Sequence, residues 1–146
     1  MKKMDEKEIR AFINEWSWCT IVGTDGNIPY AIEVTYVNDN EYMYCGSRPG
    51  GSMHNCLKNN NNLILKVCDA DKTYETWRAI SVRGQAEFIS DKEEVYRILG
   101  MIAKVRGKKE DSFDNVAEFI LNNPDGSSLF KVPIKNFTGI TRDQPL

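Results

Sequence analysis

The spacing of apolar residues near the start of the chain predicts a helix. Between Asp5 and Trp16 the apolar side chains recur every three or four positions, at Ile9, Phe12, Ile13 and Trp16. This is the period of an amphipathic helix. Asp5 and Glu8 have the spacing of a capping box, so we expect the helix to begin at Asp5.

From Trp18 onward the period changes to two, which is typical of β-strands. Residues 18–24, 28–37 and 41–45 alternate in this way, and turn-forming sequences separate them at 25–27 and 38–40. These connections are too short for a parallel crossover, so the three strands are predicted to form an antiparallel meander. In the second strand one face carries Ile28, Tyr30, Ile32, Val34 and Tyr36, a pattern more typical of core and cross-strand contacts than of a cofactor site.

The remaining elements are predicted in the same manner. A short helix begins near Met53 and ends at the asparagines 59–62, and strands follow at 63–68 and 78–89. The sequence from Ser90 to Glu93 is a second capping box, which opens a helix that ends around Gly107. A shorter helix is expected at 113–121 and a late strand at 129–134, which residues 137–141 extend. The prediction is a single domain over residues 1–146, mainly β: a six-stranded antiparallel barrel or strongly curled sheet with peripheral helices.

Composition excludes several functional classes. The 146 residues carry 19 basic and 21 acidic side chains, a net charge of −2, which argues against an electrostatic nucleic-acid binder. No apolar stretch is long enough for a signal peptide core or a membrane span. The four cysteines include no C-x-x-C pair and there is one histidine, so we expect no metal site, four small core cysteines and a reducing cytoplasm.

Two segments and the lone histidine could carry chemistry. The loop from Gly46 to Ser52 combines three glycines with Ser47, Arg48 and Ser52 ahead of a short helix, which suits a phosphate, although an ordinary glycine-rich connection has the same composition. Trp77 and Arg78 could stack on a flat ring and hold an anion, or could simply be amphipathic residues at a barrel rim. His54, the lone histidine, could contact an anion or donate a proton, or could be a surface or loop residue.

Four sequence motifs occur in the same order as in a known protein family. They are the runs from Asp25 to Val37, from Tyr42 to Ser47, from Gly51 to Asn62 and from Trp77 to Ala86. The first resembles the family pattern D-G-x-P-y-v-x-P-v-n-Y-v, and the last resembles y-x-S-V-x-x-x-G-x-a. Over residues 5–140 the chain resembles the pyridoxamine-5'-phosphate-oxidase-like, FMN-binding split-barrel superfamily, and is nearest to its nitroimidazole-resistance branch.

This resemblance implies a six-stranded split barrel and a homodimer with one FMN in each of two clefts between subunits; FAD and haem stay open as alternatives. By position, Ser47 and Arg48 would lie near the phosphate, with Ser52 and Met53 beside them. The segment that includes Glu33, Val34 and Thr35 would pass along the flavin ring. Trp77 and Arg78 would approach from nearby or from the partner chain.

The chain also departs from the family pattern at three positions. Met53 stands where the family has a phosphate-binding lysine, Gly46 where the nitroimidazole-resistance branch has a histidine, and Glu33 where a proline is common. The leading interpretation is an FMN-dependent oxidoreductase acting on small aromatic or nitro compounds. The alternatives are a non-catalytic flavin- or haem-binding module and an activity related to that of pyridoxamine 5'-phosphate oxidase. No catalytic proton donor is assigned.

Overall fold

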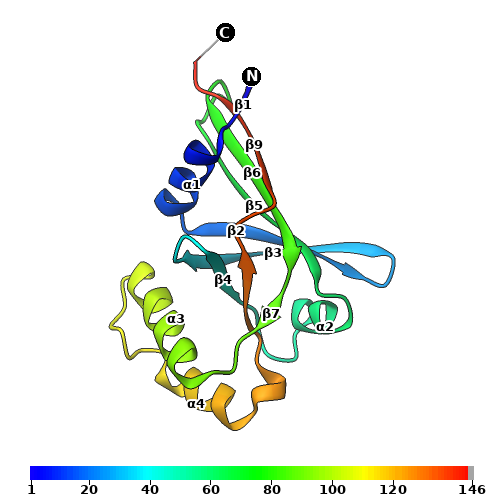
Figure 1. Cartoon of the computed structure of the whole chain (residues 1–146), viewed down its shortest axis with the longest axis vertical. Helices are drawn as coiled ribbons and strands as arrows, with labels where there is room; N and C mark the ends of the chain where they lie inside the picture. The colour runs from blue at the N-terminus through cyan, green and yellow to red at the C-terminus, as the bar shows by residue number, and fades with distance from the viewer. Residues whose placement is uncertain (145–146) are drawn as a thin grey trace.

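The computed structural model describes residues 1–144, and its main feature is one antiparallel sheet with helices around it (Figure 1). The strands are β1 (Lys2–Lys3), β2 (Trp18–Asp25), β3 (Ile28–Asn38), β4 (Tyr42–Gly46), β5 (Asn62–Ala70), β6 (Trp77–Gln85), β7 (Glu87–Phe88), β8 (Leu129–Pro133) and β9 (Phe137–Arg142). Their order across the sheet is β1-β9-β6-β5-β2-β3-β4-β8-β7. The mainly β, curled-sheet prediction is confirmed, but the strand count of six is wrong.

The larger number of strands has two causes. β1 and β7 are two-residue segments at the edges of the sheet, too short to produce a periodic signal. Residues 137–141 do not extend the late strand: β9 pairs with β6, whereas β8 pairs with β4 and β7. The expected extension is therefore wrong, because the chain turns after Ile134 and changes partners.

The predicted strand from Arg78 to Ile89 is interrupted at Ala86, where the chain passes from β6 to β7. β6 pairs with β5 and β9, while β7 lies at the opposite end of the strand order beside β8. Consecutive segments can occupy such distant places in the order only if the sheet curls back on itself. A Cβ atom on Gly84 would lie 2.8 Å from Val132 Cγ1, so the bare glycine permits the close approach of β6 and β8.

The helices are α1 (Glu6–Glu15), α2 (Ser52–Asn59), α3 (Lys92–Val105) and α4 (Asp114–Asn122), with a 3₁₀ turn, η1, at Pro124–Gly126. The capping box of Asp5 and Glu8 is present. The expected cap at Ser90 is wrong by one residue: the Asp91 carboxylate accepts from the Glu94 amide, and a carboxylate is also favoured there by the helix dipole.

Two apolar clusters stabilise the fold. One fills the curled sheet beneath α1 and α2, and includes Phe12, Tyr36 and Phe130. The other lies between the α3–α4 pair and the strands β3 and β4. Cys19, Cys45 and Cys56 are buried as expected, but the expectation is wrong for Cys68, which is exposed, because Leu63, Leu65 and Val67 take the inward positions of β5.

Candidate ligand pocket

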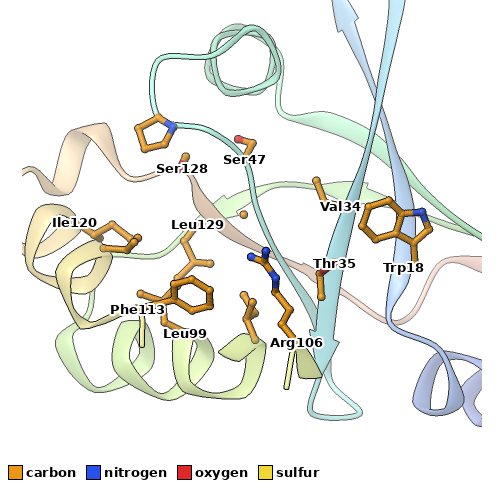
Figure 2. A pocket seen from close by; sticks show the side chains of 14 residues that line it. Trp18, Val34, Thr35, Ser47, Leu99, Arg106, Phe113, Ile120, Ser128 and Leu129 are labelled. Atoms are coloured by element: carbon orange, nitrogen blue, oxygen red, sulfur yellow. The ribbon is translucent and has the colours of Figure 1, made fainter. Parts of the chain in front are cut away.

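A pocket of about 450 Å³ opens where three parts of the fold meet (Figure 2). One wall comes from the paired strands β2 and β3, a second from α3 and α4, and the end from the loop after β4 together with the segment before β8. This volume lies within the range of roughly 300–1,000 Å³ that is usual for small-molecule sites.

The helical wall is apolar. It is lined by side chains from α3, α4 and the connection between them: Leu99, Ile102, Phe113, Val116 and Ile120. Figure 2 shows Leu99, Phe113 and Ile120 on this side of the pocket. The apolar stripe of α3 produces this wall, because its deeper members fill the second core and its outer members reach the pocket. A wall of this kind favours a ligand with a large apolar surface.

The strand wall carries an exposed indole. Trp18 lies directly opposite Thr35 in the β2–β3 register and is 53% exposed, although it lines the pocket. Sequence reasoning missed Trp18 as a site residue. The signal was available, because Cys19 and Ile21 point inward and the period of two then directs Trp18 outward. A half-exposed indole beside a pocket is suited to stack on a flat ring.

The polar end of the pocket holds a buried hydroxyl. Ser47 and Ser128 lie there, and the Ser47 amide donates to the Ser128 carbonyl at 3.3 Å. Ser47 Oγ is buried and has no hydrogen-bond partner within residues 1–144. Leaving a buried hydroxyl unpaired costs about 1–3 kcal/mol, so a polar ligand atom at this end would recover that free energy.

A tight turn follows Ser47 and leads into α2. The Gly51 amide donates to the Arg48 carbonyl at 2.9 Å, and Gly50 has a φ of +72°. With Pro49 in the second position, these are the features of a type II turn, which needs glycine third. In the described chain no side chain caps the N-terminus of α2, so that helix end keeps its attraction for an anion.

The structure brings three of the predicted site residues together. Val34, Thr35 and Ser47 line the pocket. Arg48 and Ser52 are exposed on the adjoining turn and at the start of α2, and Glu33 is exposed on β3. Met53 is buried, and its sulfur lies 3.2 Å from where Gly23 would carry a Cβ, so its side chain faces the core.

Trp77 and Arg78 line a separate cavity at the start of β6. Arg78 forms ion pairs with Glu15 at 2.8 Å and Asp69 at 2.9 Å, and its guanidinium lies 4.0 Å from the centre of the Phe12 ring. The carboxylates raise the pKa of Arg78 against the opposing effect of burial. Within one chain, this pair is not part of the pocket.

Charge at the pocket comes from one side chain. Among the lining residues, all of which lie within residues 1–144, Arg106 alone is charged. It caps the C-terminus of α3, its guanidinium lies 5.6 Å from the centre of the Phe113 ring, and Figure 2 shows it extending toward the middle of the pocket. Sequence reasoning treated it only as a helix end. No group of three or more His, Cys, Asp or Glu side chains is placed to hold a metal ion in the part of the chain that the structure describes.

Comparison with known proteins identifies the family. Residues 5–139 match the family described as pyridoxamine 5'-phosphate oxidase. The chain belongs to the pyridoxamine 5'-phosphate oxidase family. No curated protein is significantly similar to it in sequence.

Solved structures agree with the oxidase family's fold. A protein from Bacteroides thetaiotaomicron described as a "putative 5-nitroimidazole antibiotic resistance protein" is 26% identical, with a TM-score of 0.73 over 94% of this chain and 86% of that one. The FAD-binding protein from Mycobacterium smegmatis is 17% identical, with a TM-score of 0.66 over 97% and 98%. The flavocytochrome Anf3 from Azotobacter vinelandii is 16% identical, with a TM-score of 0.72 over 97% and 69%. The split-barrel expectation is thereby confirmed.

In the described chain, residues 1–144, none of the helices has both the length and the apolar character needed to cross a bilayer.

Proposed function

We propose that the pocket binds a flavin and that the protein is a flavin-dependent oxidoreductase acting on small aromatic or nitro compounds. The observation that carries the proposal is the Ser47 hydroxyl, buried and unpartnered at the polar end of a pocket whose helical wall is apolar. A flavin mononucleotide has the matching shape, because a flat apolar ring system is joined through a ribityl chain to a phosphate. The match to the oxidase family, and the neighbours described as FAD-binding, support the same ligand class.

The residues present fit such a ligand. Trp18, Val34 and Thr35 on one side and the apolar α3–α4 side chains on the other would hold the ring. Ser47, the turn at 48–51 and the uncapped start of α2 would hold the phosphate, with Arg48 as its cation in place of the lysine that Met53 replaces. When bound, the flavin supplies the capacity to accept and donate electrons; the protein supplies orientation, exclusion of water and local charge.

We propose FMN as the cofactor, with FAD as the alternative, and a homodimer as the functional unit. The half-exposed Trp18 at the strand wall supports the dimer, since a second copy laid over this face would enclose the indole and the ring. The resemblance implies that Trp77 and Arg78 approach the flavin from nearby or from the partner chain, and their absence from the pocket within one chain favours the partner chain. Light scattering gives the mass, and a monomer that binds flavin fully would contradict the dimer.

A non-catalytic binding module is the second candidate, and the charge of the pocket favours it. Arg106 alone is charged among the lining residues, and an arginine holds its proton throughout the physiological range. None of the lining side chains is thus a general acid for substrate protonation. Reduction of the bound flavin by NADH or NADPH, followed by many turnovers on a nitroaromatic acceptor, would exclude this candidate.

The deciding experiment is a visible absorption spectrum of the purified protein. Bound flavin is expected to give its two absorption bands, and heat-released flavin separated by chromatography distinguishes FMN from FAD. The same spectrum detects haem. A colourless protein that shows no saturable fluorescence change on titration with FMN or FAD would overturn the proposal.

Two arginine variants test where the phosphate and the ring lie. Arg48→Gln is expected to weaken FMN binding about tenfold, the effect of losing a hydrogen bond to a charged group, and to leave riboflavin binding unchanged because riboflavin has no phosphate. Arg106→Gln is expected to weaken both ligands alike, since this guanidinium lies over the apolar part of the pocket. Fluorescence titration measures both constants.

The exposed Lys104 on α3 offers a charge-matched control, and Lys104→Gln should bind both flavins like the unmodified protein. If Arg48→Gln bound FMN normally, Arg48 would not be the phosphate cation. If Arg106→Gln affected FMN alone, the assignment of the two ends of the pocket would be reversed.

A further inference from the structure

His54 lies directly behind the turn that adjoins the pocket. It is 3% exposed, and its Nδ1 accepts a hydrogen bond from the Gly50 amide at 2.8 Å. A ring nitrogen that accepts a hydrogen bond carries no proton, so the neutral imidazole holds its proton on Nε2. The contact therefore requires both the neutral ring and this one tautomer.

His54 lies on α2, and the same helix also binds the carbonyl group of Gly50. The side-chain amide of Asn55 donates to the Gly50 carbonyl at 3.4 Å. Both backbone polar groups of this residue, which has the left-handed φ that a type II turn requires, are thus bound to α2. Pro49 of the turn lines the pocket, and Ser47 precedes the turn. His54 consequently acts on the pocket through the backbone, without touching its interior.

The surroundings of His54 disfavour the imidazolium. The edge of the Phe88 ring lies against it from β7, with centroids 5.7 Å apart. Nε2 is buried and makes no hydrogen bond to any described residue. Burial lowers the pKa of His54 and the charge of Lys58 on α2 lowers it further. The neighbouring Ser127 carbonyl from the segment after η1, which does not meet hydrogen-bond geometry with Nε2, raises this pKa. A proton on Nδ1 would also set two donors, Nδ1–H and the Gly50 N–H, against each other.

We propose that His54 is a positioning residue that holds the 48–51 turn in its ligand-binding shape while neutral and releases it when protonated. The flavin as ligand rests on the proposed function; the coupling of His54 to the turn does not. Pro49 of the turn lines the pocket and Ser47 precedes it, so both the shape of the pocket wall and the anion contacts depend on the turn. Affinity for both FMN and riboflavin therefore falls when the turn is released.

The direction of the pH effect follows from linkage. The pKa of an unperturbed histidine is about 6.5, and that of His54 in the fold is lower. Over the interval between these two values the unfolded chain binds more protons than the folded one, so the stability from this contact is complete above about pH 6.5 and is lost as the pH falls through the folded pKa. Affinity at the pocket should decline on the same acid side.

Two substitutions at His54 distinguish the contribution of its hydrogen-bond acceptor from that of the size of its ring. Asn places an amide oxygen near the position of Nδ1 and does not titrate; Phe keeps the size of the ring without an acceptor. We expect His54→Asn to bind FMN and riboflavin normally at pH 7.5 and to lose the acid decline. We expect His54→Phe to bind both about fivefold more weakly at every pH, the effect of one neutral hydrogen bond.

Riboflavin is needed as a second probe because the FMN phosphate itself titrates near pH 6. A decline that is present for riboflavin in the unmodified protein and absent in His54→Asn belongs to the protein. Lys58→Gln removes the charge that lowers the pKa of His54, so the midpoint of the decline should move to higher pH. An identical acid decline in the unmodified protein and in His54→Asn would overturn the proposal.

The Gly50 amide provides a readout that needs no flavin. In ¹H–¹⁵N spectra its shift should follow the titration of the His54 ring, and its protection from exchange should be lost in His54→Phe and kept in His54→Asn. If the protein bound no flavin while Gly50 followed His54, the proposed function would fail and the positioning role would stand. If the chemical shift of the Gly50 amide did not change as His54 titrates, or if the amide stayed protected from exchange in His54→Phe, the positioning role would fail whatever the protein binds.

Discussion

Val116→Trp is expected to lower flavin affinity by about a hundredfold, which corresponds to about 2.8 kcal/mol of binding free energy. Val116 lines the pocket from α4 yet is 40% exposed. Because Val116 lies at the exposed edge of the pocket, an indole can be accommodated there without displacing core side chains. It would fill the space between α4 and the strand wall, where the flavin ring is expected to bind. Flavin titration followed by fluorescence measures the loss, and thermal unfolding shows whether the fold is intact.

Glu118→Trp is the matched control. Glu118 lies on the same helix and is exposed, and it does not line the pocket, so the same large side chain should leave flavin affinity within about twofold. Normal binding by Val116→Trp would mean that this pocket is not the flavin site, whereas equal losses in both variants would indicate a general disturbance of α4.

Phe130→Ala is expected to reduce the free energy of unfolding by about 3–5 kcal/mol, the usual cost of truncating a buried phenylalanine. Phe130 is fully buried in β8, where it faces Cys45 of β4 and Phe88 of β7 in the register. Its ring contacts that of Phe88, with centroids 6.2 Å apart. Because domains of this size unfold with about 5–15 kcal/mol, the variant would lose a large part of its stability. Urea denaturation measures the difference.

Phe119→Ala provides the comparison, since Phe119 is 47% exposed on α4. Its truncation should change the free energy of unfolding by about 0.5 kcal/mol or less. A loss below about 1 kcal/mol for Phe130→Ala would show that the contact among β4, β7 and β8 is not a main support of the curled sheet.

Local sequence signals located most elements and part of the site. The period of two in residues 18–45 predicted three strands that pair as expected, and the capping box at Asp5 began a helix at the right residue. The glycine-rich loop was correctly singled out, since Ser47 and the adjoining turn form the polar end of the pocket. Such signals suffice where a residue's conformation depends on its immediate neighbours.

Other features depended on which segments meet. The run at 78–89 reads as one strand, and only the curling of the sheet makes it change partners at Ala86. The local sequence identifies Arg106 only as the end of a helix. It predicts that Met53 lies beside the phosphate-binding loop. The fold directs the first toward the pocket and the second toward Gly23. Nothing in the local sequence distinguishes these outcomes.

The sequence by itself determined the strand and helix periods, the turn residues, the near-neutral charge and the glycine loop, because these depend on backbone preferences and side-chain chemistry within a few positions. The tertiary structure decided which walls face each other across the pocket, left the Ser47 hydroxyl without a partner and buried the lone histidine against Gly50. The physical reason is that burial and hydrogen-bond pairing are set by contacts between residues distant in sequence, and those contacts exist only after the sheet has curled.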